Sequence, residues 1–110
     1  MKTTYMTVEF ETEESFFQFL RDNKKVIVKF FAPWCGACKS IRPFFNELAN
    51  SGAYKGVKFA NVDVDRLPKL ANRFGVHAMP TFVFYVNGNK VEEFVGASEE
   101  SLLEMLARNK

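Results

Sequence analysis

Two kinds of hydrophobic pattern alternate along this chain. Short runs of β-branched and aromatic residues are typical of strands, whereas apolar residues that recur every three or four positions indicate helices. The predicted strands are residues 7–10, 26–31, 57–64, 81–86 and 91–95. The predicted helices are residues 12–23, 35–49 and 66–74, with a last helix from residue 98. Strand and helix therefore alternate until the last two strands, which follow one another directly.

The run Val26–Phe31 contains almost no polar positions, which predicts a strand that is buried on both faces, as in parallel sheets. Asn87-Gly88 lies between the last two predicted strands and is a strong signal for a tight hairpin. Parallel strands joined through helices, followed by an antiparallel hairpin, define an α/β fold. We predict a central mixed five-stranded sheet with four helices on both of its faces.

Local signals also predict where several helices begin. Thr12 and Ser98 each precede two glutamates and are expected to cap the helices that follow. Asp65 is expected to cap a helix from Arg66 to Phe74. Pro43 lies within the second predicted helix and is expected to kink it.

Composition limits the functions that remain open. The 110 residues, 47% hydrophobic and 25% charged, are expected to form one globular domain spanning 1–110. A net charge of +2, with no long basic run, gives no support for a nucleic-acid partner. No segment has the length and apolarity of a membrane span, and the first residues do not resemble a signal peptide. We therefore expect no membrane partner and a cytoplasmic location.

Cys35 and Cys38 are the two cysteines of the sequence, and they directly follow the predicted buried strand. A zinc site needs four ligands, and the chain offers only His77 in addition, so zinc would require two chains to share one ion. A dithiol switch needs only a lowered thiol pKa and access to a partner disulfide. His77 receives no role, and we expect no metal in this chain.

The position of the pair predicts different chemical roles for the two cysteines. A cysteine at a helix N-terminus meets unsatisfied N–H groups and the positive end of the helix dipole, which favour its thiolate. Cys35 is therefore the predicted nucleophile and Cys38, one turn further on, the predicted resolving thiol. Trp34 stands beside the nucleophile and is expected to cover the site or to contact substrate.

Several segments resemble the thioredoxin family in order and spacing across nearly the whole chain. They are Ala32–Lys39, Arg42-Pro43-Phe44, Val62–Asp65, Met79–Phe82 and Val95-Gly96-Ala97. The resemblance implies a thioredoxin fold and a thiol-disulfide oxidoreductase that reduces protein disulfides, in electron transport and cell redox homeostasis. It also implies a protein that holds no cofactor and is reduced by an NADPH-dependent thioredoxin reductase. A monomer is the default expectation.

The same resemblance implies a cis peptide bond between Met79 and Pro80, facing the dithiol. The Met79 backbone would then receive an extended segment of the substrate as a short added strand. A glycine at position 96 allows close approach of that backbone. The predicted substrate groove is formed by Trp34, Gly36, Ala37, Met79, Pro80, Val95 and Gly96.

This chain departs from the family pattern at two places. Lys29 stands where thioredoxins usually carry a buried carboxylate, and Ala37 stands where they usually carry proline. A buried lysine would stabilise the Cys35 thiolate, or would itself accept a proton if neutral; alternatively, its ammonium extends into water with little effect. Residues expected to tune the redox potential are Lys29, Gly36, Ala37 and Pro80.

Two other functions remain open from the sequence. An oxidising or protein disulfide isomerase-like domain would have a higher redox potential, a direction that Lys29 and Ala37 favour. A non-catalytic binding module would use the fold for assembly, although both cysteines, Trp34 and Pro80 are present. Asp63 and Asp65 resemble a metal-binding pair, but a strand end and a helix cap explain them.

Overall fold

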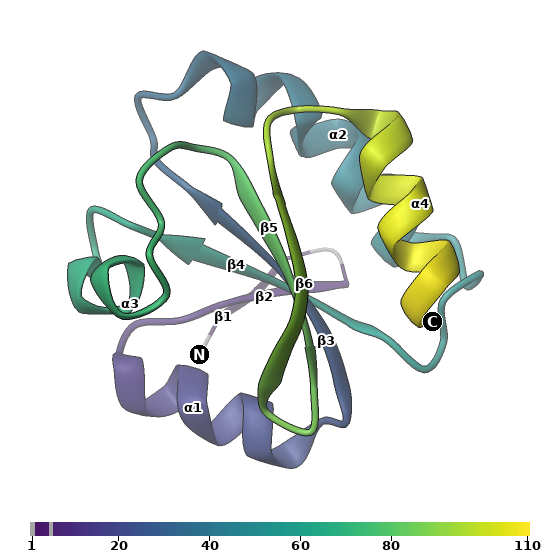
Figure 1. Cartoon of the computed structure of the whole chain (residues 1–110), viewed down its shortest axis with the longest axis horizontal. Coiled ribbons are helices and arrows are strands. Elements are labelled where there is room, and N and C mark those ends of the chain that lie inside the picture. Colours follow the sequence, from purple (N-terminus) through teal and green to yellow (C-terminus); the bar gives the residue numbers. More distant parts are fainter. Residues whose placement is uncertain (1, 5) are drawn as a thin grey trace.

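A computed structural model of the chain describes residues 2–4 and 6–110. The elements are arranged as a central sheet with helices packed on both sides (Figure 1). The strands are β1 (Lys2–Thr4), β2 (Thr7–Glu9), β3 (Lys25–Phe31), β4 (Lys58–Asp63), β5 (Thr81–Val86) and β6 (Asn89–Val95). The helices are α1 (Glu13–Asp22), α2 (Gly36–Asn50), α3 (Pro68–Arg73) and α4 (Glu99–Asn109).

The sheet is mixed, with the strand order β1-β2-β4-β3-β5-β6 in the described residues. β3 and β4 run parallel, as do β2 and β4, whereas β5 is antiparallel to both β3 and β6. This confirms the predicted mixed sheet with its five strands. The structure adds β1, which pairs antiparallel with β2 at the edge. The segment Lys2-Thr3-Thr4 contains no apolar residue, so it shows no hydrophobic strand pattern in the sequence.

Each face of the sheet has its own hydrophobic core. On one face, Phe16 of α1 and Leu70 of α3 pack with Val28 and Tyr85. On the other face, side chains from α2 and α4 pack with Ile27, Phe59, Phe82 and Phe84. Figure 1 shows the same division, with α1 and α3 on one side and α2 and α4 on the other. β3 contributes side chains to both cores, and this packing on both faces fixes the position of its C-terminal end.

The predicted caps of the first and last helices are confirmed. The Thr12 side chain accepts the backbone N–H of Ser15 at 3.1 Å, and Ser98 accepts that of Ser101 at 3.0 Å. The predicted hairpin is also present, with positive φ at Asn87 (53°) and Gly88 (81°). These contacts join residues no more than three positions apart, which explains why local sequence predicted them.

The predicted cap at Asp65 is wrong, because α3 begins later than expected. The Asp63 carbonyl accepts the N–H of Arg66 at 3.1 Å and that of Leu67 at 2.9 Å, so a separate turn follows β4. The helix begins at Pro68, with Leu67 at the N-cap and no side-chain capping bond. Proline suits a first helical position because its φ is already helical and it has no N–H to satisfy.

None of the helices in the described residues is long and apolar enough to cross a membrane.

Candidate active site

Cys35 and Cys38 lie where β3 passes into α2, and they form a disulfide. Cys35 is the N-cap residue of α2, with an extended backbone at φ −87° and ψ 113°. The backbone N–H of Cys38 donates to the Cys35 Sγ at 3.1 Å. This sulfur therefore takes the place of a capping oxygen at the positive end of the helix. The predicted position of Cys35 at the helix N-terminus is confirmed.

The two cysteines are nearly equally shielded, with exposed fractions of 7% for Cys35 and 4% for Cys38. Cys38 is the more buried of the pair, as expected, but the difference is small. α2 continues through Pro43, so the dithiol belongs to one long helix that is packed against the sheet. That helix and β3 together hold both sulfur atoms in place.

The Met79-Pro80 peptide bond is cis and lies next to the dithiol. The Met79 carbonyl oxygen is 3.5 Å from the Cys35 Sγ. The Pro80 carbonyl accepts the N–H of Gly96 at 2.9 Å, which joins this turn to the end of β6. The structure thus brings residues from three distant parts of the sequence to the nucleophile, as the resemblance implied.

The predicted groove residues surround this contact, and all of them except the buried Pro80 are at least partly exposed. Trp34 is 67% exposed and Val95 is 58% exposed, although both are large and apolar. Gly36 and Ala37 are exposed beside Cys35, and Met79 is half-buried. An exposed apolar rim around a reactive pair is typical of a surface that binds other proteins.

Gly96 is required by its backbone conformation. Its φ is +114°, a region that residues with a side chain rarely adopt. A Cβ added there would meet no atom of this chain within 4 Å. Crowding within the chain is therefore not the reason for this glycine, and the space above it remains open to a substrate backbone.

Asp65 joins the site through a contact that the sequence did not predict. Its Oδ2 accepts a hydrogen bond from the Trp34 Nε1 at 3.0 Å. The two residues are 31 positions apart, so no local pattern connects them. Asp65 orients the indole beside Cys35 instead of capping α3, and it is the site residue that sequence reasoning missed.

Lys29 is buried in β3, with an exposed fraction of only 4%. Its ammonium lies 5.0 Å from the centre of the Phe45 ring and 5.7 Å from that of Phe31. The pKa of Lys29 is lowered to about 8, mainly by burial and also by the positive charge of Arg42, while the negative charge of Glu9 opposes the shift. The alternative in which this ammonium extends into bulk water is therefore wrong.

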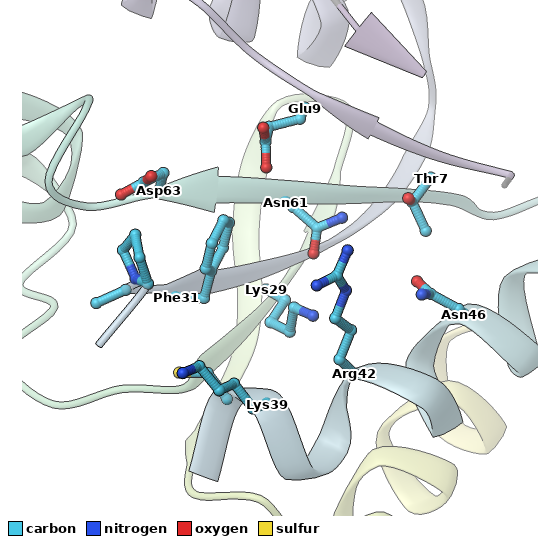
Figure 2. Close-up of a pocket in the computed structure, with 12 residues that line it drawn as sticks. Thr7, Glu9, Lys29, Phe31, Lys39, Arg42, Asn46, Asn61 and Asp63 are labelled. Atoms are coloured by element: carbon cyan, nitrogen blue, oxygen red, sulfur yellow. The ribbon is translucent and has the colours of Figure 1, made fainter. Parts of the chain in front are cut away.

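A cavity of about 380 Å³ lies between the sheet and α2, behind the dithiol. Lys29 and Cys38 both line it, whereas Cys35 does not. Figure 2 shows the Lys29 and Arg42 side chains converging in the space between α2 and β4. Lys29 therefore faces the resolving cysteine more directly than the nucleophile.

Among the described residues, no group of three or more His, Cys, Asp or Glu side chains could hold a metal ion. Asp63 accepts the backbone N–H groups of Asp65 and Arg66 with its Oδ1, at 2.9 and 3.3 Å, within the turn after β4. His77 is exposed on the segment before Met79. These residues are accounted for without a ligand.

A cysteine pair at a helix N-terminus, beside a cis-prolyl turn and an exposed apolar rim, defines a thiol-disulfide oxidoreductase. Comparison with known proteins gives the same class. Residues 7–108 match the family described as Thioredoxin. The chain therefore belongs to the thioredoxin family.

Individual relatives agree over most of their length. The chain is 50% identical to Thioredoxin-1 of Schizosaccharomyces pombe over 80 residues, covering 73% of this chain and 76% of that protein. It is 39% identical to thioredoxin of Ictalurus punctatus over 107 residues, covering 96% of this chain and 100% of that protein. The crystal structure of Malassezia sympodialis thioredoxin superposes with a TM-score of 0.89 at 34% identity, covering 99% of this chain and 95% of that one.

Proposed function

We propose that this chain reduces protein disulfides, with Cys35 as the attacking residue and Cys38 as the resolving residue. The Cys35 thiolate attacks one sulfur of the substrate disulfide, and the other substrate sulfur leaves as a thiolate that takes up a proton. The Cys38 thiolate then attacks the Cys35 sulfur of the mixed disulfide. The second substrate thiol leaves, and two electrons have passed from the chain to the substrate.

The contact at the start of α2 carries this proposal. An Sγ that accepts an N–H at 3.1 Å at the positive end of a helix is stabilised as a thiolate, which is both the better nucleophile and the better leaving group. Cys38 does not have this N-cap position. The asymmetry of the two positions supports the assignment of roles.

The turn at Met79 supports the proposed mode of substrate binding. Its carbonyl stands 3.5 Å from the reactive sulfur, where an extended substrate segment could pair with the Met79 backbone. Trp34 and Val95 would contact apolar side chains of that segment, and Gly96 leaves room for its backbone. Gly36 and Ala37 complete the surface that is offered to the substrate, and the buried Pro80 lies beneath it.

The oxidised chain needs a source of electrons to act again. We propose an NADPH-dependent thioredoxin reductase as that source, by analogy with the family, together with disulfide-containing proteins as substrates. We also propose action as a monomer in the cytoplasm, in electron transport and redox homeostasis. The support for these points is family membership and a dithiol that can accept electrons from another protein.

Lys29 favours the second candidate, a more oxidising or isomerase-like function. Its buried positive charge stabilises a thiolate on Cys38 across the shared cavity, and hence the reduced form of the pair. A dithiol whose reduced form is stabilised has a higher redox potential. Ala37 in the motif acts on the same equilibrium. We propose that these residues raise the redox potential of the Cys35–Cys38 pair, but not far enough to make the chain an oxidase or isomerase.

Turnover of a protein disulfide tests the proposed function. Insulin should be reduced repeatedly in the presence of NADPH and a thioredoxin reductase, and Cys35→Ser should abolish the reaction. Cys38→Ser should instead accumulate mixed disulfides on Cys35, because the resolving thiol is absent. A folded parent protein that is reduced but leaves insulin intact would show a non-catalytic binding module.

A further inference from the structure

The cavity behind the dithiol is lined by more basic than acidic side chains. Lys29 comes from β3, and Lys39 and Arg42 come from α2. Two carboxylates also line the cavity, Glu9 from β2 and Asp63 from β4. Positively charged side chains from two elements therefore line one partly open cavity (Figure 2).

The three cations have no hydrogen-bond acceptor in the part of the chain that the structure describes. No side-chain hydrogen bond or ion pair joins Lys29, Lys39 or Arg42 to another described residue. Lys29 is the critical case, because it is buried, its ammonium lies near the Phe31 and Phe45 rings, and it lines the cavity. A desolvated cation in this position favours an anion as its partner.

The acidic residues do not satisfy these cations. The Asp63 Oδ1 already accepts backbone N–H groups from Asp65 and Arg66. Glu9 acts on Lys29 through space, without an ion pair between them. The Oδ1 of Asn61 is buried on the cavity wall and has no hydrogen-bond partner among the described residues. A flip of this amide would turn its NH₂ donors toward an anion.

We propose that this cavity binds a small inorganic oxyanion, phosphate or sulfate, through Lys29, Arg42, Lys39 and the Asn61 amide. Guanidinium groups bind tetrahedral oxyanions through paired N–H donors, and ammonium groups add point charges. A volume of about 380 Å³ is ample, because about 10–15 Å³ of such space holds one water molecule. Lys39 and Arg42 are exposed and form the route by which the ion enters.

The bound ion would act on the chemistry of Cys38, a consequence that rests on the proposed function. Cys38 lines the same cavity, so an anion there opposes a thiolate on its sulfur by charge repulsion. Phosphate would then slow the resolving step of disulfide exchange. The binding itself does not depend on this step, because the oxidised protein already contains the site.

Binding is therefore tested on the oxidised protein, without turnover. Isotope-labelled protein is titrated with inorganic phosphate at about pH 7, with ionic strength held constant by sodium chloride, and amide shifts are followed by NMR. Saturable shifts are expected at residues 29, 38, 42 and 61. Lys29→Met and Arg42→Gln should each weaken phosphate binding about tenfold or more, since a charged hydrogen bond contributes about 1.5–3 kcal/mol. Arg42 is exposed, so its replacement leaves the core intact.

Two further variants separate a specific site from general attraction to positive charge. Lys69→Met removes one exposed cation of α3, outside the cavity, and should leave phosphate affinity within about twofold. Glu9→Gln removes the unengaged carboxylate and should tighten binding. The proposal is overturned if the parent shows no saturable shifts, if Lys29→Met and Arg42→Gln titrate like the parent, or if Lys69→Met weakens binding equally. Loss of insulin reduction with phosphate binding intact would overturn the proposed function alone.

Discussion

Replacing Lys29 by methionine should stabilise the folded protein near neutral pH. The variant keeps an unbranched side chain between Phe31 and Phe45 and removes the buried charge. The pKa of Lys29 falls from 10.5 to about 8 in the folded state, and each pH unit corresponds to about 1.4 kcal/mol. The protonated lysine therefore costs about 3 kcal/mol of folding free energy. Loss of the cation–π contacts, worth about 0.5–1 kcal/mol each, reduces the expected gain to about 2 kcal/mol.

The pH dependence separates this effect from better packing. A lysine with a depressed folded-state pKa destabilises the protein fully below that pKa, and the cost disappears as pH rises toward the unfolded value. The cost of Lys29 should thus be complete at about pH 7, be reduced by about 2 kcal/mol at about pH 9.5, and disappear only above the unfolded pKa of 10.5. Relative to Lys29→Met, the parent should gain about 2 kcal/mol between these two conditions.

Urea unfolding of the oxidised parent, Lys29→Met and the surface control Lys69→Met measures these free energies directly. The disulfide keeps both thiols from titrating during the experiment. Lys69→Met should follow the parent at both pH values, because Lys69 is exposed on α3. A difference between Lys29→Met and the parent that stays constant from about pH 7 to about pH 9.5 would refute a desolvated Lys29 charge.

Three further predictions concern the dithiol and its surroundings. Cys38→Ser should retain substrate proteins on Cys35 as mixed disulfides, detected on non-reducing gels; equal retention by Cys35→Ser would contradict the assigned roles. Asp65→Ala should shift the emission spectrum of Trp34, the single tryptophan, and change the free energy of unfolding by less than about 0.5 kcal/mol. An unchanged spectrum would show that the indole contact is absent in solution. Gly96→Ala should cost about 1–3 kcal/mol in urea unfolding, because φ is +114°, and a neutral effect would contradict that conformation.

Features that depend on near neighbours in the chain could be predicted from the sequence. Thr12 and Ser98 cap their helices through residues three positions away, and Cys35 does the same through Cys38. The strand and helix order followed from the hydrophobic pattern, because helices bury one stripe and the central strand β3 buries both of its faces. Residues close together in the sequence were enough to predict each of these features.

Features that depend on assembly of the fold could not be predicted in this way. Asp65 is a residue type that often caps helices, but a turn follows β4, so α3 begins further along the chain. The Asp65 carboxylate instead accepts the Trp34 indole N–H. The burial of Lys29 depends on α2 covering β3, and a lysine in a strand is equally consistent with a solvated ammonium. The contact between Met79 and Cys35 joins residues 44 positions apart, and family resemblance supplied it.

The redox potential of the Cys35–Cys38 pair tests the proposed reductase most directly. It is measured by equilibrating the protein with dithiothreitol buffers of graded composition and determining the fraction of the pair that is oxidised. A reductase should lie closer to about −270 mV, the value for thioredoxin, than to about −180 mV, the value for protein disulfide isomerase. The positive charge of Lys29 should place it somewhat above about −270 mV. A potential at or above about −180 mV would contradict net reduction of protein disulfides by this chain.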